Sequence, residues 1–221
     1  TAFSSESAVA EEGGAISYNI GYMSEYWYRG VHQSDSAVSF GADYEVGGFY
    51  LGTWWADVDT GLEHDYYGGY AFSAMGMDMY AGFTGYYYTD NFDSDYEEFN
   101  FGVAMGPIAV DFADGNYDGS SVTDTGYTFT SVALDLAMVG LPMTLTAGYW
   151  GGDSSLKGNV YTLDYGTTVS GVDVGLQIGR NDDDITAGSR GASSVDTTFA
   201  VFSLGYSCLL YTSPSPRDGF T

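Results

Sequence analysis

Residues 38–46 read Val-Ser-Phe-Gly-Ala-Asp-Tyr-Glu-Val, and apolar side chains alternate along this stretch with small or charged ones. Successive side chains of a β-strand point to opposite faces. The alternation therefore predicts a strand whose apolar face carries Val38 and Phe40 and whose polar face carries Asp43 and Glu45.

The same period of two recurs along the chain, and no convincing helical periodicity or 18-residue apolar run competes with it. The composition agrees, because 32 Gly residues would each cost about 1 kcal/mol relative to Ala inside a helix. Twelve strands are predicted, over residues 15–28, 37–46, 49–57, 63–72, 77–88, 96–106, 108–113, 125–137, 143–150, 159–169, 172–180 and 195–206.

Short and long connections alternate between these predicted strands. Gly47-Gly48 and Ser170-Gly171 are tight turns, whereas residues 29–36 and 114–124 form long polar loops. All short turns would then lie at one rim, as in outer-membrane barrels with an even number of strands, whereas a Greek-key sandwich would mix the two. The sequence therefore predicts an all-β fold, a transmembrane antiparallel up-and-down β-barrel of about 12 strands in the bacterial outer membrane.

Aromatic residues cluster where the predicted strands meet the long loops. Rings with a polar group favour the membrane–water interface. Aromatic residues also favour strands in general, which explains their number but not their clustering at one rim. We therefore expect an interfacial girdle of Tyr26, Trp27, Tyr28, Trp54, Trp55, Tyr66, Tyr67, Tyr86, Tyr87, Tyr88, Tyr149 and Trp150.

The chain is strongly acidic, with 30 Asp and Glu against 5 Lys and Arg and a formal net charge of -25. Nucleic acid is therefore not an expected partner, because its phosphates are bound through Lys and Arg. Rings of Asp and Glu favour cations, so carboxylates on the polar strand face predict a cation-preferring lumen. Some of them, above all Glu45 and Asp78, could instead cap turns or lie solvated at the rim. The expected pore-lining residues are Glu25, Asp43, Glu45, Asp65, Asp78, Glu98, Asp111, Asp135, Asp164 and Asp173.

One region carries a family resemblance. Residues 26–35 read Tyr-Trp-Tyr-Arg-Gly-Val-His-Gln-Ser-Asp, residues 48–54 read Gly-Phe-Tyr-Leu-Gly-Thr-Trp, and residues 66–70 read Tyr-Tyr-Gly-Gly-Tyr. This pattern resembles the TorF-type family of Gram-negative bacteria, whose members are assigned as outer-membrane porins, and is clearest over residues 15–90. The resemblance implies a porin-type barrel and supplies no substrate. The matching motif positions are Arg29, Gly30 and Gln33.

Both ends of the chain differ from its middle. Residues 1–10 end on the small residues of a signal-peptidase site, so we expect a signal-peptide remnant there, with a disordered segment as the alternative. Residues 208–218 resemble a translated sequencing adapter, so we expect residues 208–221 to be a non-native tail and residues 11–207 to be the barrel. Such barrels end on an aromatic residue that the barrel-assembly machinery recognises. The expected partners are that machinery, outer-membrane lipid, and small hydrophilic solutes or cations.

Other chemistry has little support in the sequence. The loop that contains Asp90, Asp93 and Asp95 offers oxygen ligands of the kind that Ca²⁺ prefers, but no loop has a complete calcium-binding spacing, so no metal site or cofactor is predicted. His32 and Ser34 lie close in sequence, but no nucleophile motif accompanies them. We therefore do not expect an enzyme.

Two functions are consistent with these patterns. The first is a porin-like channel for passive diffusion of small hydrophilic solutes, which prefers cations because its lumen is acidic. The alternative is a closed structural or binding barrel whose acidic surface loops engage a partner or divalent cations.

Overall fold

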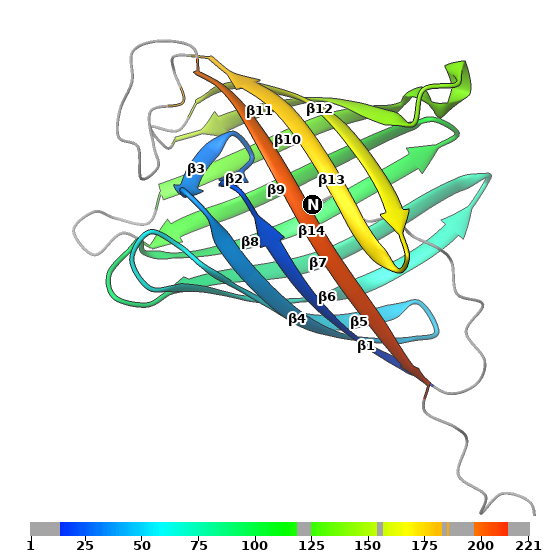
Figure 1. The fold of residues 1–221 in the computed structure, drawn as a ribbon, viewed down its shortest axis with the longest axis horizontal. Helices are drawn as coiled ribbons and strands as arrows, with labels where there is room; N and C mark the ends of the chain where they lie inside the picture. The colour runs from blue at the N-terminus through cyan, green and yellow to red at the C-terminus, as the bar shows by residue number, and fades with distance from the viewer. Residues whose placement is uncertain (1–13, 119–124, 154–156, 183–184, 186–196, 212–221) are drawn as a thin grey trace, which may run out of the picture.

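The computed structural model describes residues 14–118, 125–153, 157–182, 185 and 197–211. Twelve antiparallel strands close into one barrel, in which each strand pairs with its neighbours along the barrel sequence and the first pairs with the last (Figure 1). The barrel strands are β1 (Ala15–Met23), β4 (Ala37–Val46), β5 (Phe49–Asp57), β6 (Leu62–Ala74), β7 (Met77–Tyr88), β8 (Asp95–Met105), β9 (Ile108–Asp118), β10 (Thr125–Asp135), β11 (Met143–Gly152), β12 (Gly158–Val169), β13 (Val172–Asn181) and β14 (Thr197–Tyr211). The predicted fold class is confirmed.

Helical structure is sparse in the part of the chain that is described. A short 3₁₀ helix, η1 (Leu136–Val139), lies between β10 and β11. No described helix is both long enough and apolar enough to cross a membrane.

The outer face of the barrel is apolar. Cross-strand pairs bring like residues together on this face, for example Phe40 with Trp55 and Phe83 with Phe99. These side chains are open to the surroundings, and Phe99 is 73% exposed. A continuous apolar surface of this extent marks contact with lipid or with another protein.

The short turns have the backbone conformation that their glycines permit. Gly47 and Gly48 have φ values of 56° and 86°, and Ser170 and Gly171 have φ values of 53° and 82°. Positive φ at both central residues is the requirement of a type I′ hairpin, whose twist matches that of the flanking strands. These turns lie at one rim of the barrel and the longer connections at the other (Figure 1).

The first long connection differs from the prediction. Residues 15–28 were expected to form one strand and residues 29–36 an outer loop, but β1 ends at Met23. A separate two-stranded sheet follows, made of β2 (Tyr26–Tyr28) and β3 (Val31–Ser34). This inner hairpin, residues 26–34, lies inside the barrel at the long-loop end (Figure 1). The sequence does not reveal the break between β1 and β2, because the alternation of apolar and polar side chains continues from one strand into the other.

The predicted boundaries at the two chain ends have different outcomes. The strand β14 continues through residues 208–211, where Cys208 pairs with Tyr18 and Tyr211 with Ala15 of β1. The predicted tail therefore begins within a strand of the structure. The predicted signal-peptide remnant, residues 1–10, and residues 212–221 lie outside the described residues.

Candidate functional site

The interior of the barrel has two halves along its axis. Near the short turns, inward side chains such as Asp43, Asp111 and Asp164 are partly accessible. Near the long loops, inward side chains such as Glu63 and Trp150 are almost completely buried, at 1% and 3% exposure. We call these regions the open half and the packed half. The packed half is the part that contains the inner hairpin.

The tip of the inner hairpin is a strained turn. Arg29 has a φ of 47° and Gly30 a φ of 81°, and a positive φ costs a residue other than Gly roughly 1–2 kcal/mol. Such a conformation persists only where surrounding contacts impose it. Trp150 Nε1 donates to the carbonyl oxygen of Arg29 at 2.8 Å, and Asn181 Nδ2 donates to that of Gly30 at 2.6 Å. The barrel wall therefore holds both residues of the turn.

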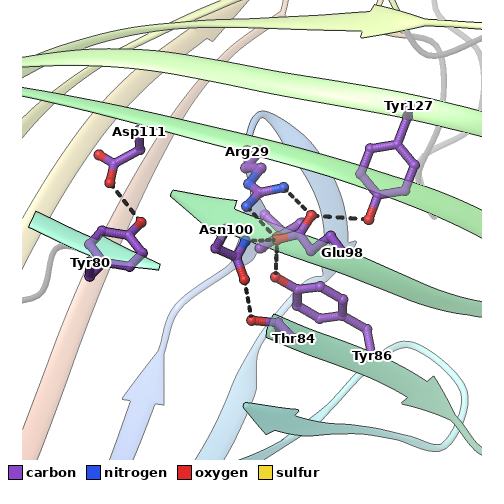
Figure 2. Close-up of polar contacts among 9 residues, drawn as sticks. Arg29, Tyr80, Thr84, Tyr86, Glu98, Asn100, Asp111 and Tyr127 are labelled. Atoms are coloured by element: carbon purple, nitrogen blue, oxygen red, sulfur yellow. Dashed lines mark hydrogen bonds and ion pairs between the residues drawn. The ribbon is translucent and has the colours of Figure 1, made fainter. Parts of the chain in front are cut away.

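A buried ion pair joins the hairpin tip to strand β8. The Arg29 guanidinium donates to both carboxylate oxygens of Glu98, at 2.8 and 2.9 Å, and the Glu98 side chain has no exposed surface. Tyr86, Asn100 and Tyr127 also donate to Glu98, at 2.9, 2.7 and 3.0 Å (Figure 2). Burial of a charge is costly unless the charge is paired and hydrogen-bonded, and Glu98 meets both conditions.

Aromatic rings surround the guanidinium. The Arg29 Cζ atom lies 4.8 Å from the ring centroid of Tyr28, 4.7 Å from that of Phe129 and 5.6 Å from that of Trp150. Cations are attracted to ring faces within about 6 Å, and more strongly when water is excluded. Arg29 is therefore held in two ways: its N–H groups donate to the Glu98 carboxylate, and the face of its guanidinium packs against aromatic rings.

The body of the hairpin contacts several other strands. Tyr26 donates to Glu63 Oε1 on β6 at 2.8 Å, and Tyr28 donates to the Tyr86 hydroxyl on β7 at 2.6 Å. On another side, the Trp27 ring stacks on Phe199 of β14 with centroids 4.2 Å apart. The hairpin thus bridges strands from different sides of the packed half.

Strand register places most of the predicted pore-lining carboxylates on the inner face. Glu25 is the exception, since it lies between β1 and β2 and accepts from Trp27 Nε1 at 2.6 Å. Glu98 is on the inner face but is fully buried and ion-paired, so it does not line open space. The other inward residues are Asp43, Glu45, Asp65, Asp78, Asp111, Asp135, Asp164 and Asp173.

Neighbouring side chains hold several carboxylates of the open half in place. Tyr67 donates to Asp43 at 2.5 Å and Tyr80 donates to Asp111 at 2.8 Å, the latter visible in Figure 2. Asp135 instead caps η1 by accepting from the amide of Ala137. The open half is therefore an acidic vestibule with ordered walls.

One inward carboxylate was missed by the sequence analysis. Glu63 is 1% exposed, and its Oε1 atom accepts from Tyr26. Its position two residues before Asp65 places it on the same strand face, so the alternation rule could have identified it. Its burial could not be identified in this way, because the hairpin causes it.

The predicted aromatic girdle is wrong for most of its residues. Four of its residues face outward, and for these the prediction of contact with the membrane–water interface stands: Trp55, Tyr66, Tyr87 and Tyr149. Adjacent aromatics in a strand point to opposite faces, and the hairpin brings three more rings inside. The rings that face inward are Tyr26, Trp27, Tyr28, Trp54, Tyr67, Tyr86, Tyr88 and Trp150.

The histidines do not form a hydrolytic arrangement with the nearby serines. His32 Nε2 lies 3.4 Å from Asp35 Oδ1, while the Ser34 hydroxyl donates to the carbonyl oxygen of Ser36. His64 stacks on Trp55 on the outer face, with centroids 3.9 Å apart. Within the described ranges, no group of three or more His, Cys, Asp or Glu side chains is placed to hold a metal ion.

A glycine substitution tests how tightly the hairpin tip is enclosed. Gly30→Ala places a Cβ atom 2.8 Å from Val160 Cγ2, whereas Gly47→Ala at an outer turn meets nothing within 4 Å. Both replacements impose a positive φ on Ala, which costs about 1–2 kcal/mol. We expect Gly30→Ala to lose about 1–3 kcal/mol more because of overpacking. Urea unfolding of the folded barrel, followed by Trp fluorescence, measures this difference, and equal losses would contradict an enclosed tip.

Comparison with known proteins places the chain in a family. Residues 7–205 match the family described as "Bacterial protein of unknown function (Gcw_chp)". The chain belongs to the Gcw_chp family. The inner hairpin and the barrel strands up to residue 205 lie within the matched region. The TorF-type assignment is not part of this family description and stays a prediction. No curated protein matches the Gcw_chp chain.

Solved structures resemble the Gcw_chp barrel in fold. A structure described as "KdgM porin" aligns with a TM-score of 0.53 at 9% identity, covering 90% of this chain and 99% of the other. OpdK, an outer-membrane protein of Pseudomonas aeruginosa, aligns with a TM-score of 0.46 at 12% identity, covering 91% of this chain and 68% of the other. This chain covers 60% of OccAB2 from Acinetobacter baumannii. The fold is thus one that the protein described as "KdgM porin" also has.

Proposed function

We propose that the chain is a porin-like outer-membrane channel for passive diffusion of small hydrophilic solutes, with a preference for cations. The observation that carries the proposal is the charge of the interior. Of the basic residues in the described part of the chain, Arg29 lies inside the barrel and is paired with Glu98, Arg180 faces outward, and Lys157 is in a loop. The accessible carboxylates of the open half therefore keep their negative field, which attracts cations.

The outer face supports the proposed location in the outer membrane. Phe40, Phe101 and Leu145 are about half exposed, at 51%, 49% and 45%, and lie on the outer face of a closed barrel. Lipid would cover these side chains, and closure leaves no unpaired strand edge in the hydrocarbon. Outer-membrane lipid and the barrel-assembly machinery are the partners that this proposal requires. It includes no catalytic role.

Ion selectivity tests the proposal. In a planar bilayer with a salt gradient, we expect the reversal potential of the folded barrel to indicate cation preference. The double variant Asp43→Asn/Asp164→Asn should reduce that preference, because it removes two accessible inner charges. The matched control is Glu97→Gln, whose carboxylate accepts from Tyr87 on the outer face. A reversal potential that indicates anion preference would refute the acidic-lumen argument.

The packed half favours a second candidate function, a closed structural or binding barrel. The inner hairpin and the rings around it occupy that end of the interior. Under this alternative, acidic surface loops such as the one with Asp90 and Asp93 engage a partner or divalent cations. Absence of conductance from the wild type and from variants with a displaced hairpin would support the closed barrel over the channel.

A further inference from the structure

The inner hairpin is structurally separate from the barrel wall. Strands β2 and β3 pair with each other and form a sheet of their own, while the barrel closes by pairing β1 directly with β4. A two-stranded sheet alone is marginally stable in water. The position of the hairpin therefore depends on its side-chain and tip contacts with the wall and on a backbone hydrogen bond in which the Asp59 amide donates to the Gln33 carbonyl oxygen at 3.2 Å, and the wall is complete without it.

The wall is shaped to accommodate the hairpin. Inward positions of the packed half include the small residues Ala37, Ala56 and Ala113, which are 1%, 1% and 2% exposed. Ala37 and Ala56 pack in one cluster with Tyr26 of the hairpin, and Ala113 packs in another with Val31. The hairpin thus occupies the space that these small side chains leave in the lumen. Displacement of the hairpin would consequently open the packed half.

The contact between Arg29 and Glu98 holds the tip. It is an ion pair between the hairpin and the wall, and its two residues are 69 positions apart in sequence. Breaking a buried pair by removal of one partner is strongly unfavourable because the other charge is left uncompensated. Arg29 without Glu98 would be stabilised by leaving the packed half for water.

We propose that the inner hairpin is a displaceable plug and that Glu98 is the positioning residue that keeps it closed through Arg29. The proposal rests on the proposed channel function and adds to it the element that restricts the pore. The closed state is the one in which the tip accepts from Trp150 and Asn181. In the open state the hairpin leaves the packed half, and the two halves of the lumen are joined.

The variant Glu98→Gln tests the plug. Gln keeps the shape of the side chain but cannot neutralise Arg29. We expect the ratio of open to closed plug to rise about a hundredfold. Glu97→Gln is the matched control, because it removes a carboxylate from the adjacent residue on the outer face. Folding of each variant is checked by the shift in gel mobility between heated and unheated barrel.

Two measurements test the plug proposal and the channel proposal independently of each other. Hydrogen exchange of residues 26–34 reports hairpin displacement whether or not the barrel conducts, and bilayer recording reports conductance. We expect Glu98→Gln, but not Glu97→Gln, to accelerate exchange in residues 26–34 and to raise single-channel conductance severalfold. Unchanged exchange in residues 26–34 would overturn the plug and leave the channel intact. Faster exchange without conductance would support Glu98 as the positioning residue and refute the channel.

A second variant keeps the test available if Glu98→Gln does not fold. Trp150→Phe retains a ring beside Arg29 but removes the indole N–H that donates to the Arg29 carbonyl oxygen. We expect a smaller change in the same direction, with faster exchange in residues 26–34 and unchanged exchange in the strands. If residues 26–34 of Trp150→Phe exchange their amide hydrogens at the same rate as in the wild type, the result would count against displacement of the tip.

Discussion

Arg29→Ala is expected to lower the free energy of unfolding by about 3–5 kcal/mol, the typical cost of removing one partner of a buried ion pair. The substitution leaves the Glu98 carboxylate buried with Tyr86, Asn100 and Tyr127 as its remaining donors. These neutral donors do not compensate a full charge. The three ring contacts of the guanidinium are lost as well.

Urea unfolding in detergent micelles, followed by Trp fluorescence, gives the free energy of unfolding of Arg29→Ala. Lys157→Ala is the control, because it also removes one positive charge but from an exposed loop position. Surface substitutions of this kind change stability by less than about 0.5 kcal/mol. Equal stability of the two variants would show that the Arg29 pair contributes nothing net to the fold. The double variant Arg29→Ala/Glu98→Gln should recover part of the loss, because it leaves no buried charge unpaired.

Val132→Lys is expected to destabilise the barrel by about 2–4 kcal/mol in lipid vesicles, the cost of a Lys at the lipid-facing centre of an outer-membrane barrel. Val132 lies within β10, pairs with Val110 and Ala147, and is 47% exposed on the outer face. In water an exposed Lys at this site would cost little. The size of the loss therefore measures whether lipid covers this face.

Ser131→Lys provides the matched control for Val132→Lys. Ser131 is the adjacent residue, faces inward, and pairs across the strands with Asp111. A Lys there meets an opposite charge in the accessible half, so we expect a loss below about 1 kcal/mol. Similar stabilities for both variants in vesicles would contradict a lipid-facing exterior and, with it, the proposed location.

The polar organisation of the interior connects stability to function. In the packed half the Arg29 guanidinium neutralises Glu98, while the carboxylates of the open half have partners such as Tyr67 and Tyr80 that carry no charge. Negative potential is thus retained where water has access. In the proposed cation-preferring channel, these unneutralised carboxylates would supply the negative field that attracts cations.

The barrel itself was predictable because its signals are local. Alternation in residues 38–46 assigns Val38 to the outer face and Asp43 to the inner face without knowledge of any partner strand. The paired glycines of Gly47-Gly48 specify a tight turn by their permitted φ values. Repetition of these two signals determines the number of strands, their antiparallel order and the apolar exterior.

The inner hairpin was not predictable in the same way. Tyr26 and Tyr28 were expected at the outer girdle, because the alternation does not distinguish a strand in the wall from one that folds into the lumen. Their burial depends on the small residues opposite them, such as Ala56 and Ala113, which come from distant strands.

The acidic barrel could be predicted from the sequence alone, because strand period and turn conformation depend on neighbouring residues. The location of residues 26–34 in the packed half, and the pairing of Glu98 with Arg29 instead of a pore-lining position, became visible only in the folded chain. These two features depend on residues that are far apart in sequence. The contact spans 69 residues of sequence and lies buried inside the closed barrel, so no local pattern in the sequence identifies it.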